Sequence, residues 1–144
     1  MTVEEKQEVT SHQVSTFGVE LLRDVLLPEI LGKHSEEVMY WSGKHLARKF
    51  PVADEAELVS FFHEATWGYL TKQSESRTGV VFECSGEYIE KRLSLKETPS
   101  FSLEAGFLAL QVEQQVKRRT ESTYTIEKRK KKVTFTLKWE EFVK

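Results

Sequence analysis

The sequence predicts an α+β fold, in which N-terminal helices and one buried central helix pack on one face of a twisted antiparallel sheet. Three observations lead to it. Apolar residues recur at helical spacing in the first half of the chain, and they alternate as in strands in the second. Between the predicted strands lies a helical segment that is apolar nearly all round. We expect one domain over residues 12–144, preceded by a flexible tail over residues 1–11.

Two helices come first. The earlier one begins near Ser11, is expected to kink or restart at Pro28, and ends at Gly32. The next begins at Ser35 and stops before Pro51. The apolar residues of the first helix recur at three and four positions and form one face: Val14, Phe17, Leu21, Leu22, Val25 and Leu26. The second is expected to turn four residues inward: Val38, Trp41, Leu46 and Phe50.

A third helix opens at Asp54, because Glu57 three residues later resembles a capping box. The period then changes, and alternation predicts strands over Tyr69–Ser74, Thr78–Cys84 and Glu87–Leu95. The buried central helix follows over Leu103–Arg118. The chain closes on a hairpin, with strands over Thr123–Lys128 and Lys132–Trp139.

The composition and charge of the chain exclude several classes of protein. The single cysteine, Cys84, excludes an internal disulfide and a cysteine-based zinc site. No apolar run approaches the roughly 20 residues of a membrane span, and residues 1–11 lack a secretion signal. We therefore expect a cytoplasmic protein. The net charge of −2 is unevenly spread, since residues 1–66 carry 6 basic and 12 acidic side chains and residues 67–144 carry 15 and 11.

Catalytic patterns are missing from the sequence. The four histidines form no His-Glu-x-x-His motif, and there is neither a glycine-rich phosphate loop nor a Gly-x-Ser-x-Gly elbow. We expect no catalytic residues, no metal site and no cofactor. Cys84 shares a strand face with Val80 and Phe82, which favours a small core side chain over an acylated or redox-sensing thiol.

Three sets of residues are candidates for binding. An aromatic set with one histidine could line a ligand cavity or simply fill the core: Trp41, His45, Phe62, Trp67 and Phe107. A glycine inside the central helix, Gly106, indicates close approach of another helix, from this chain or from a second copy. Five cations at the hairpin tip could be a solvated turn, meet phosphates, or dock on an acidic partner: Lys128, Arg129, Lys130, Lys131 and Lys132.

Several segments together resemble the YslB-like family of small bacterial proteins, over about residues 17–139. They are Phe17–Asp24, Tyr40–Lys44, Trp67–Gly68, Leu103–Ala109 and Lys131–Thr136. The segment Leu103–Ala109 also resembles the signature of vinyl-reductase-type domains, which share a fold with the small acyl-binding subunits of the TRAPP vesicle-tethering complex. This resemblance implies a TRAPP-subunit-like fold, a homodimer, and relatives that use a hydrophobic pocket for an aromatic effector or an acyl chain.

The sequence departs from that family pattern in its cysteines. The terminal hairpin has none, and Cys84 does not align with the acylated cysteine of the TRAPP subunits, so neither metal nor acyl function is carried over. We expect a non-catalytic module that binds an apolar or aromatic small molecule or a protein partner. The alternative is an accessory protein for nucleic acid or anionic membranes, using the hairpin cations together with Lys117–Arg119.

Overall fold

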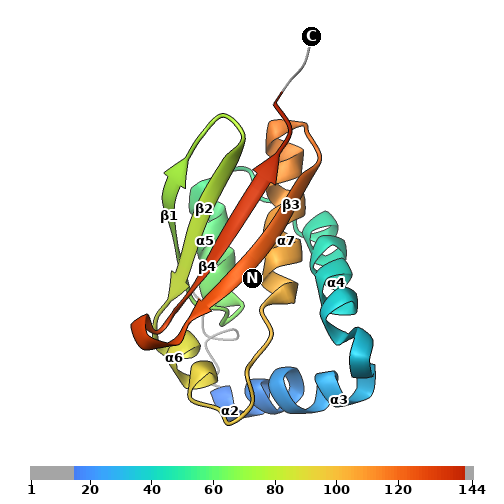
Figure 1. Cartoon of the computed structure of the whole chain (residues 1–144), viewed down its shortest axis with the longest axis vertical. Helices are drawn as coiled ribbons and strands as arrows, with labels where there is room; N and C mark the ends of the chain where they lie inside the picture. Colours follow the sequence, from blue (N-terminus) through green and yellow to red (C-terminus); the bar gives the residue numbers. More distant parts are fainter. Residues whose placement is uncertain (1–14, 142–144) are drawn as a thin grey trace, which may run out of the picture.

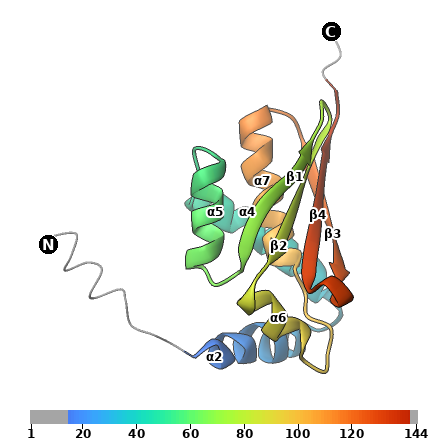
Figure 2. The same ribbon diagram turned by 90° about the vertical axis from the view of Figure 1, so that its left-hand side faces the viewer.

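The computed structural model describes residues 15–141 and confirms the predicted α+β architecture. A four-stranded antiparallel sheet carries the long helices on one face, while none of the helices formed by residues 15–141 covers the other face (Figures 1 and 2). No helix in this part of the chain combines the length and apolar character needed to cross a membrane. The expected tail over residues 1–11 and the helix start near Ser11 lie outside the described residues.

An arm of consecutive short helical segments opens the described chain at the base of the molecule (Figure 1). Pro28 occupies the first turn of one of these segments, where a missing N–H is tolerated, so the helical path continues through it. Gly32 ends that segment at φ +66°, as predicted. The arm comprises α2 (Thr16–Glu20), a π-helical stretch η1 (Leu21–Leu26), α3 (Leu27–Leu31) and a 3₁₀ turn η2 (Gly32–His34).

Two further helices follow the arm, α4 (Ser35–Lys49) and α5 (Glu55–Glu64). The predicted cap at Asp54 is confirmed, because its Oδ1 accepts a hydrogen bond of 2.9 Å from the N–H of Glu57. The Glu57 carboxylate reaches back to the N–H of Ala53 at 2.6 Å. The two reciprocal hydrogen bonds of Asp54 and Glu57 therefore fix the start of α5, as a capping box does.

The sheet is built from two hairpins that meet along β2 and β4, in the order β1-β2-β4-β3. Both hairpins were predicted. The alternation is also confirmed, because Val80, Phe82 and Cys84 of β2 are buried toward the helices. The strands are β1 (Tyr69–Glu75), β2 (Gly79–Ser85), β3 (Thr120–Glu127) and β4 (Lys132–Trp139), with a 3₁₀ turn η3 (Lys128–Lys130) at the second tip.

The predicted strand over Glu87–Leu95 is wrong, because this segment forms helix α6 (Glu87–Leu93). Ile89 and Leu93 lie four residues apart, so they share a face of a helix as well as a face of a strand, and both are buried. Gly86, at φ +102°, turns the chain out of β2 just before the helix begins. Alternation over so short a run did not distinguish the two structures.

The central helix is α7 (Ser102–Val116), and every residue from 104 to 112 is buried. It lies between the sheet and α4 (Figure 1) and ends at Lys117, whose backbone is left-handed at φ +61°. The prediction of a buried central helix is confirmed. The core of the domain is formed around α7 by the inward faces of β2 and β4 and by α5.

Candidate functional site

Three of the five residues predicted to line a pocket are core side chains. Phe62 and Phe107 are fully buried, and Trp67 is nearly so. The Trp67 ring packs edge-on against both, with centroids 5.0 Å from Phe62 and 5.2 Å from Phe107. Phe61 stacks on Phe107 at 4.5 Å. Because the rings contact one another, they fill the space between α5 and α7, and their role in holding a ligand stays a prediction.

The other two pocket residues, Trp41 and His45, lie on the outer side of α4. The Trp41 side chain is 65% exposed, so the expectation that it faces inward is wrong, and His45 is exposed as well. The helix turns a different stripe inward, made of Met39, Gly43 and Ala47. The expected inward positions Val38 and Phe50 are exposed as well, whereas Leu46 is half-buried and packs on the core.

Gly43 and Gly106 explain why the Met39–Gly43–Ala47 side of α4 packs against α7. A Cβ atom on Gly106 would overlap the carbonyl oxygen of Tyr40, and one on Gly43 would overlap the carbonyl oxygen of Leu103. The expectation that Gly106 admits another helix is confirmed, and that helix is α4 of the same chain. Sequence reasoning missed Gly43, although a glycine inside a predicted helix was the same signal.

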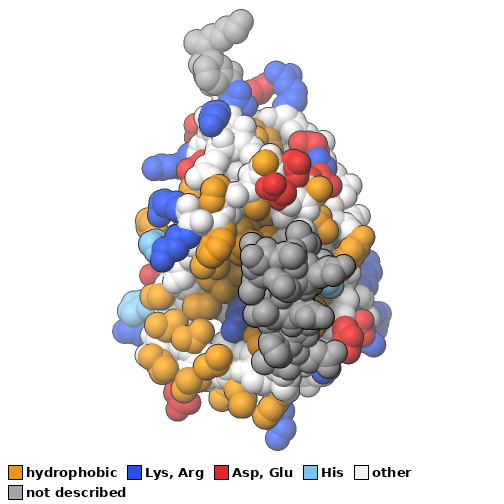
Figure 3. Space-filling model, turned by 180° about the vertical axis from the view of Figure 1, so that it is seen from behind, with side chains coloured by type: hydrophobic (Ala, Val, Ile, Leu, Met, Phe, Trp, Pro, Cys, Tyr) orange, Lys and Arg blue, Asp and Glu red, His pale blue; other side chains and the backbone are white. Residues whose placement is uncertain are grey.

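Large apolar side chains of the arm and of the first half of α4 point outward and form a surface that we call the arm face. The apolar residues that the sequence places on one face of the first helix are exposed, since the Phe17 side chain is 62% exposed and Leu22 57%. Val14, the first residue of that predicted face, lies outside the described residues. Figure 3 shows hydrophobic side chains gathered over the lower part of this side of the molecule. The arm face consists of Phe17, Leu21, Leu22, Val25, Leu26, Ile30, Val38 and Trp41.

The inward side of the arm carries charges instead. Arg23 makes a bidentate pair with Glu104 of α7, at 2.9 and 2.8 Å. Arg92 of α6 binds Asp24 at 2.6 Å and Glu104 at 3.2 Å, and its guanidinium lies 4.4 Å above the Phe101 ring. Asp24, Arg92 and Glu104 are all buried. The cluster of two cations and two carboxylates is electrically balanced, as burial requires.

Electrostatics keep Glu104 ionised in this cluster. Burial acts to raise the pKa of its carboxyl group, but the charge and hydrogen bonds of Arg23, together with the charge of Arg92, hold the pKa below its ordinary value. For Arg23, burial acts to lower the pKa, and Glu104 raises it above its ordinary value. Both partners are therefore charged at neutral pH, and the arm is attached to the core through ion pairs.

Cys84 is a buried core residue, as predicted. Its Sγ lies 3.5 Å from the carbonyl oxygen of Trp67. Burial raises the pKa of the thiol well above its ordinary value, with the charge of Glu104 adding to the effect. Because the reactive species is the thiolate, this environment makes the side chain unreactive.

The predicted cluster of hairpin cations is largely matched by carboxylates. Lys132 contacts Glu83, and also Glu127 at 3.7 Å. Glu127 lies 4.0 Å from Lys130 as well, and Glu90 of α6 lies 3.8 Å from Lys131. The hairpin tip therefore presents a mixed surface to a phosphate, although Lys128 and Arg129 are exposed.

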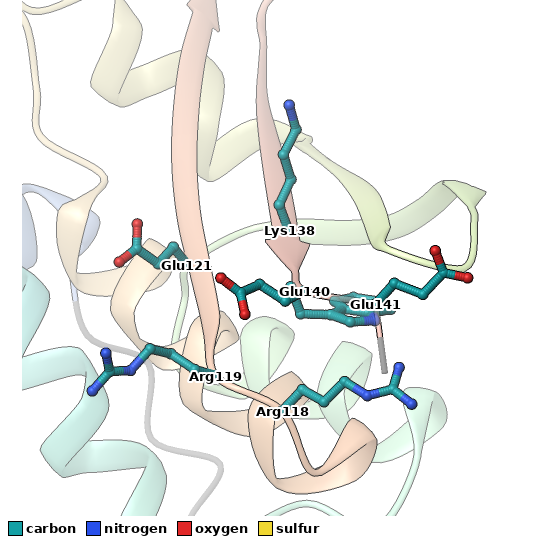
Figure 4. Close-up of a pocket in the computed structure, with 7 residues that line it drawn as sticks. Arg118, Arg119, Glu121, Lys138, Glu140 and Glu141 are labelled. Carbon is teal, nitrogen blue, oxygen red and sulfur yellow. The ribbon is translucent and has the colours of Figure 1, made fainter. Parts of the chain in front are cut away.

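An open hollow lies at the opposite end of β3 and β4 (Figure 4). It brings together two of the cations predicted near the end of the central helix, Arg118 and Arg119, with Lys138. Three carboxylates face the same space, and Arg77 pairs with one of them, Glu141. The hollow thus has no predominant charge. Its lining residues are Arg118, Arg119, Glu121, Lys138, Trp139, Glu140 and Glu141.

Titratable side chains form no metal-binding cluster in residues 15–141, where no three of His, Cys, Asp and Glu come together in a way that could hold an ion. Residues 16–138 match a family described as "Protein of unknown function (DUF2507)". The chain belongs to this family.

Known proteins similar to this DUF2507 chain agree with the resemblance seen in the sequence. This chain is 41% identical over 128 residues to the "Uncharacterized protein YslB" of Bacillus subtilis. The match covers 89% of this chain and 86% of that protein. Its fold is similar to the crystal structure of a vinyl-4-reductase family protein from Methanocaldococcus jannaschii. That match has a TM-score of 0.59 and covers 95% of this chain and 90% of the other. At 18% identity, this likeness concerns the fold.

Proposed function

We propose that this chain is a non-catalytic binding module that docks a protein partner through the arm face. The observation that carries the proposal is the outward orientation of eight large apolar side chains on neighbouring elements. Contiguous apolar surface of this kind is unusual on a monomer and marks interaction sites. We further infer that the module works in the cytoplasm, where a single cysteine stays reduced.

Binding of an apolar small molecule has less support. The aromatic residues that would line its pocket, Phe62, Trp67 and Phe107, already contact one another. A ligand bound between these rings would have to break the contacts that they make with one another. The arm face, in contrast, is accessible without any rearrangement.

Site-specific photo-crosslinking in living cells tests the proposal. A photoreactive phenylalanine analogue at Ile30 or Trp41, both exposed on the arm face, is expected to form a covalent adduct with a protein. The matched control is the same analogue at Thr123, which is exposed on the uncovered face of the sheet. Adducts at Thr123 equal to those at Ile30, or no adduct at Ile30 and Trp41, would contradict the proposal.

A further inference from the structure

We propose that the partner docks through an acidic amphipathic helix that lies along α4, with its apolar side on the arm face and its carboxylates on three cations of the second half of α4. These residues, which we call the α4 cations, are Lys44, Arg48 and Lys49. The inference rests on the proposed function, because it names the chemistry of the partner that binds the same surface. Three properties of the described residues support it: the spacing of the α4 cations beside apolar side chains, their lack of carboxylate partners, and the position of the nearby carboxylates.

The first property is the spacing of residues along the outer side of α4. Trp41 precedes Lys44 by three residues and Arg48 by seven, so these side chains follow one side of the helix. Val38 precedes Lys49 by eleven residues, about three turns, so this pair follows the neighbouring side. Each side therefore leads from an apolar residue of the arm face to a cation. This order suits a docked helix that presents apolar residues and carboxylates at three- and four-residue spacing.

The second property is the lack of carboxylate partners for the α4 cations. Within residues 15–141, neither Lys44 nor Arg48 nor Lys49 forms an ion pair. Lys44 instead places its Nζ 5.6 Å from the centroid of the Trp41 ring, in a cation–π contact. At the hairpin tip, in contrast, each lysine of Lys130–Lys132 lies near a carboxylate. The α4 cations are therefore available to carboxylates of a partner.

The third property is the position of the carboxylates on α4. Glu36 and Glu37 lie in the first turn, and Glu37 precedes Arg48 by eleven residues, or about 16 Å along the helix axis. The Glu36 carboxylate accepts hydrogen bonds from the hydroxyl groups of Ser102 and Tyr124. Glu37 is left at the outer surface, where it repels an acidic residue placed over the first turn. The carboxylates of the docked helix must therefore lie near the end that covers the second half of α4.

An anionic lipid surface also combines apolar groups with negative charge, but it fits this distribution less well. Its phosphates extend over the whole area of contact, so they would meet carboxylates as well as cations. Glu29 is exposed in the arm, and Glu37 lies one turn before Trp41. Only one exposed cation, Lys33, lies between these two glutamates in the sequence. A helix with carboxylates near one end reaches the α4 cations and avoids both glutamates.

Two synthetic helical peptides of about 15 residues, the length of α4, test the charge preference. Both carry the same leucine stripe, and at one end the first has glutamates and the second lysines beside the leucines. We expect fluorescence anisotropy at low salt to show at least about tenfold tighter binding of the glutamate peptide, because several ion pairs each contribute modestly. The double variant Arg48→Glu, Lys49→Glu should lose this preference. The matched control, Lys128→Glu with Arg129→Glu, reverses two exposed cations at the hairpin tip and should retain it.

Photo-crosslinking in cells separates this inference from the proposed function. In the Arg48→Glu, Lys49→Glu background, the protein adduct at Ile30 should fall at least about tenfold, whereas the hairpin control background should retain it. An adduct at Ile30 that is unchanged in both backgrounds would overturn the acidic helix and leave the proposed function standing, as would equal binding of the two peptides.

Three further outcomes would also overturn the inference. One is an adduct at Ile30 between two copies of this chain. Another is binding of the wild type to phosphatidylglycerol vesicles that is lost in the Arg48→Glu, Lys49→Glu variant, which would assign the α4 cations to a lipid. The third is the absence of any adduct at Ile30 and Trp41, which would contradict the proposed function as well.

Discussion

At the scale of single residues, Gly106 and Gly43 decide how closely α4 can approach α7. Each glycine faces a backbone carbonyl of the other helix, so neither has room for a methyl group. This contact also sets the rotation of α4 about its axis. Because the small stripe must face α7, Trp41 is turned to the surface. The arm face is therefore partly a consequence of two missing side chains.

Gly106→Ala is predicted to destabilise the protein by about 1–3 kcal/mol or more, because the new Cβ would overlap the Tyr40 carbonyl oxygen and push the helices apart. Gly18→Ala is the matched control, since nothing lies within 4 Å of its added Cβ. That substitution in α2 is expected to stabilise by about 0.5–1 kcal/mol. Urea denaturation measures both free energies of unfolding. Equal effects of the two substitutions would contradict the packing argument.

Glu104→Gln is predicted to cost about 3–5 kcal/mol, because it removes a charge from a buried cluster and leaves Arg23 without its partner. The pH dependence follows from the lowered pKa of the folded state. The stabilisation by Glu104 is complete above its unfolded pKa of about 4.3 and is lost as the pH falls through the lower folded pKa. Denaturation curves between pH 7 and pH 3 should show this acid loss in the wild type and a smaller one in the variant. Glu29→Gln, at an exposed position, should leave the wild-type loss unchanged.

At the scale of elements, α7 and the arm are held to the rest of the fold by different interactions: α7 by apolar packing and the arm by ion pairs. α7 is buried among apolar side chains of the sheet and of α4 and α5. The arm exposes its apolar side and contributes Arg23 and Asp24 to a buried ion cluster. Its attachment therefore depends on directional charge pairs, so local opening of the arm requires little loss of apolar contact.

Asp24→Asn is predicted to loosen the arm selectively. The substitution removes the carboxylate that binds Arg92, whereas Arg92 keeps Glu104 as a partner. Hydrogen exchange of the amides in residues 16–31 should become about tenfold or more faster, which corresponds to about 1.4 kcal/mol of local opening. Amides of β2 and β4 should change much less. Glu29→Gln, on the exposed side of the same arm, is the control. Uniform acceleration in the arm and the sheet would show that the cluster holds the whole fold instead.

Sequence reasoning succeeded where one local pattern fits one structure. Both hairpins, the cap at Asp54 and the buried helix α7 were predictable for this reason. It failed for α6, because the spacing of Ile89 and Leu93 fits a strand and a helix equally well. The ion cluster was not predictable at all, since Arg23 and Glu104 are separated by 81 positions. The arm face was missed because its apolar periodicity shows that a face exists, but not whether the same chain covers it.

At the scale of the whole molecule, folding redistributes the charges that the sequence separates. The second half of the chain carries 15 cations and 11 carboxylates, which suggested a basic surface. In the folded chain, Lys130, Lys131 and Lys132 each lie near a carboxylate, and Arg118 and Arg119 share a hollow with three more. Even the sheet partner of the hairpin, β2, contributes Glu83 to this neutralisation.

Binding to nucleic acid is therefore predicted to be weak. At physiological salt, the affinity for a 20-base-pair duplex should be poorer than the roughly 10⁻⁴ M that limits ordinary non-specific DNA binding. Lys128 and Arg129 are exposed cations at the hairpin tip. Reversing their charges by Lys128→Glu and Arg129→Glu should then change the affinity for DNA little. Fluorescence anisotropy at 50 and 200 mM salt measures both effects. A micromolar affinity that falls steeply with salt and is lost in this double variant would instead establish the hairpin as a phosphate-binding site, since each neutralised phosphate adds to the salt dependence.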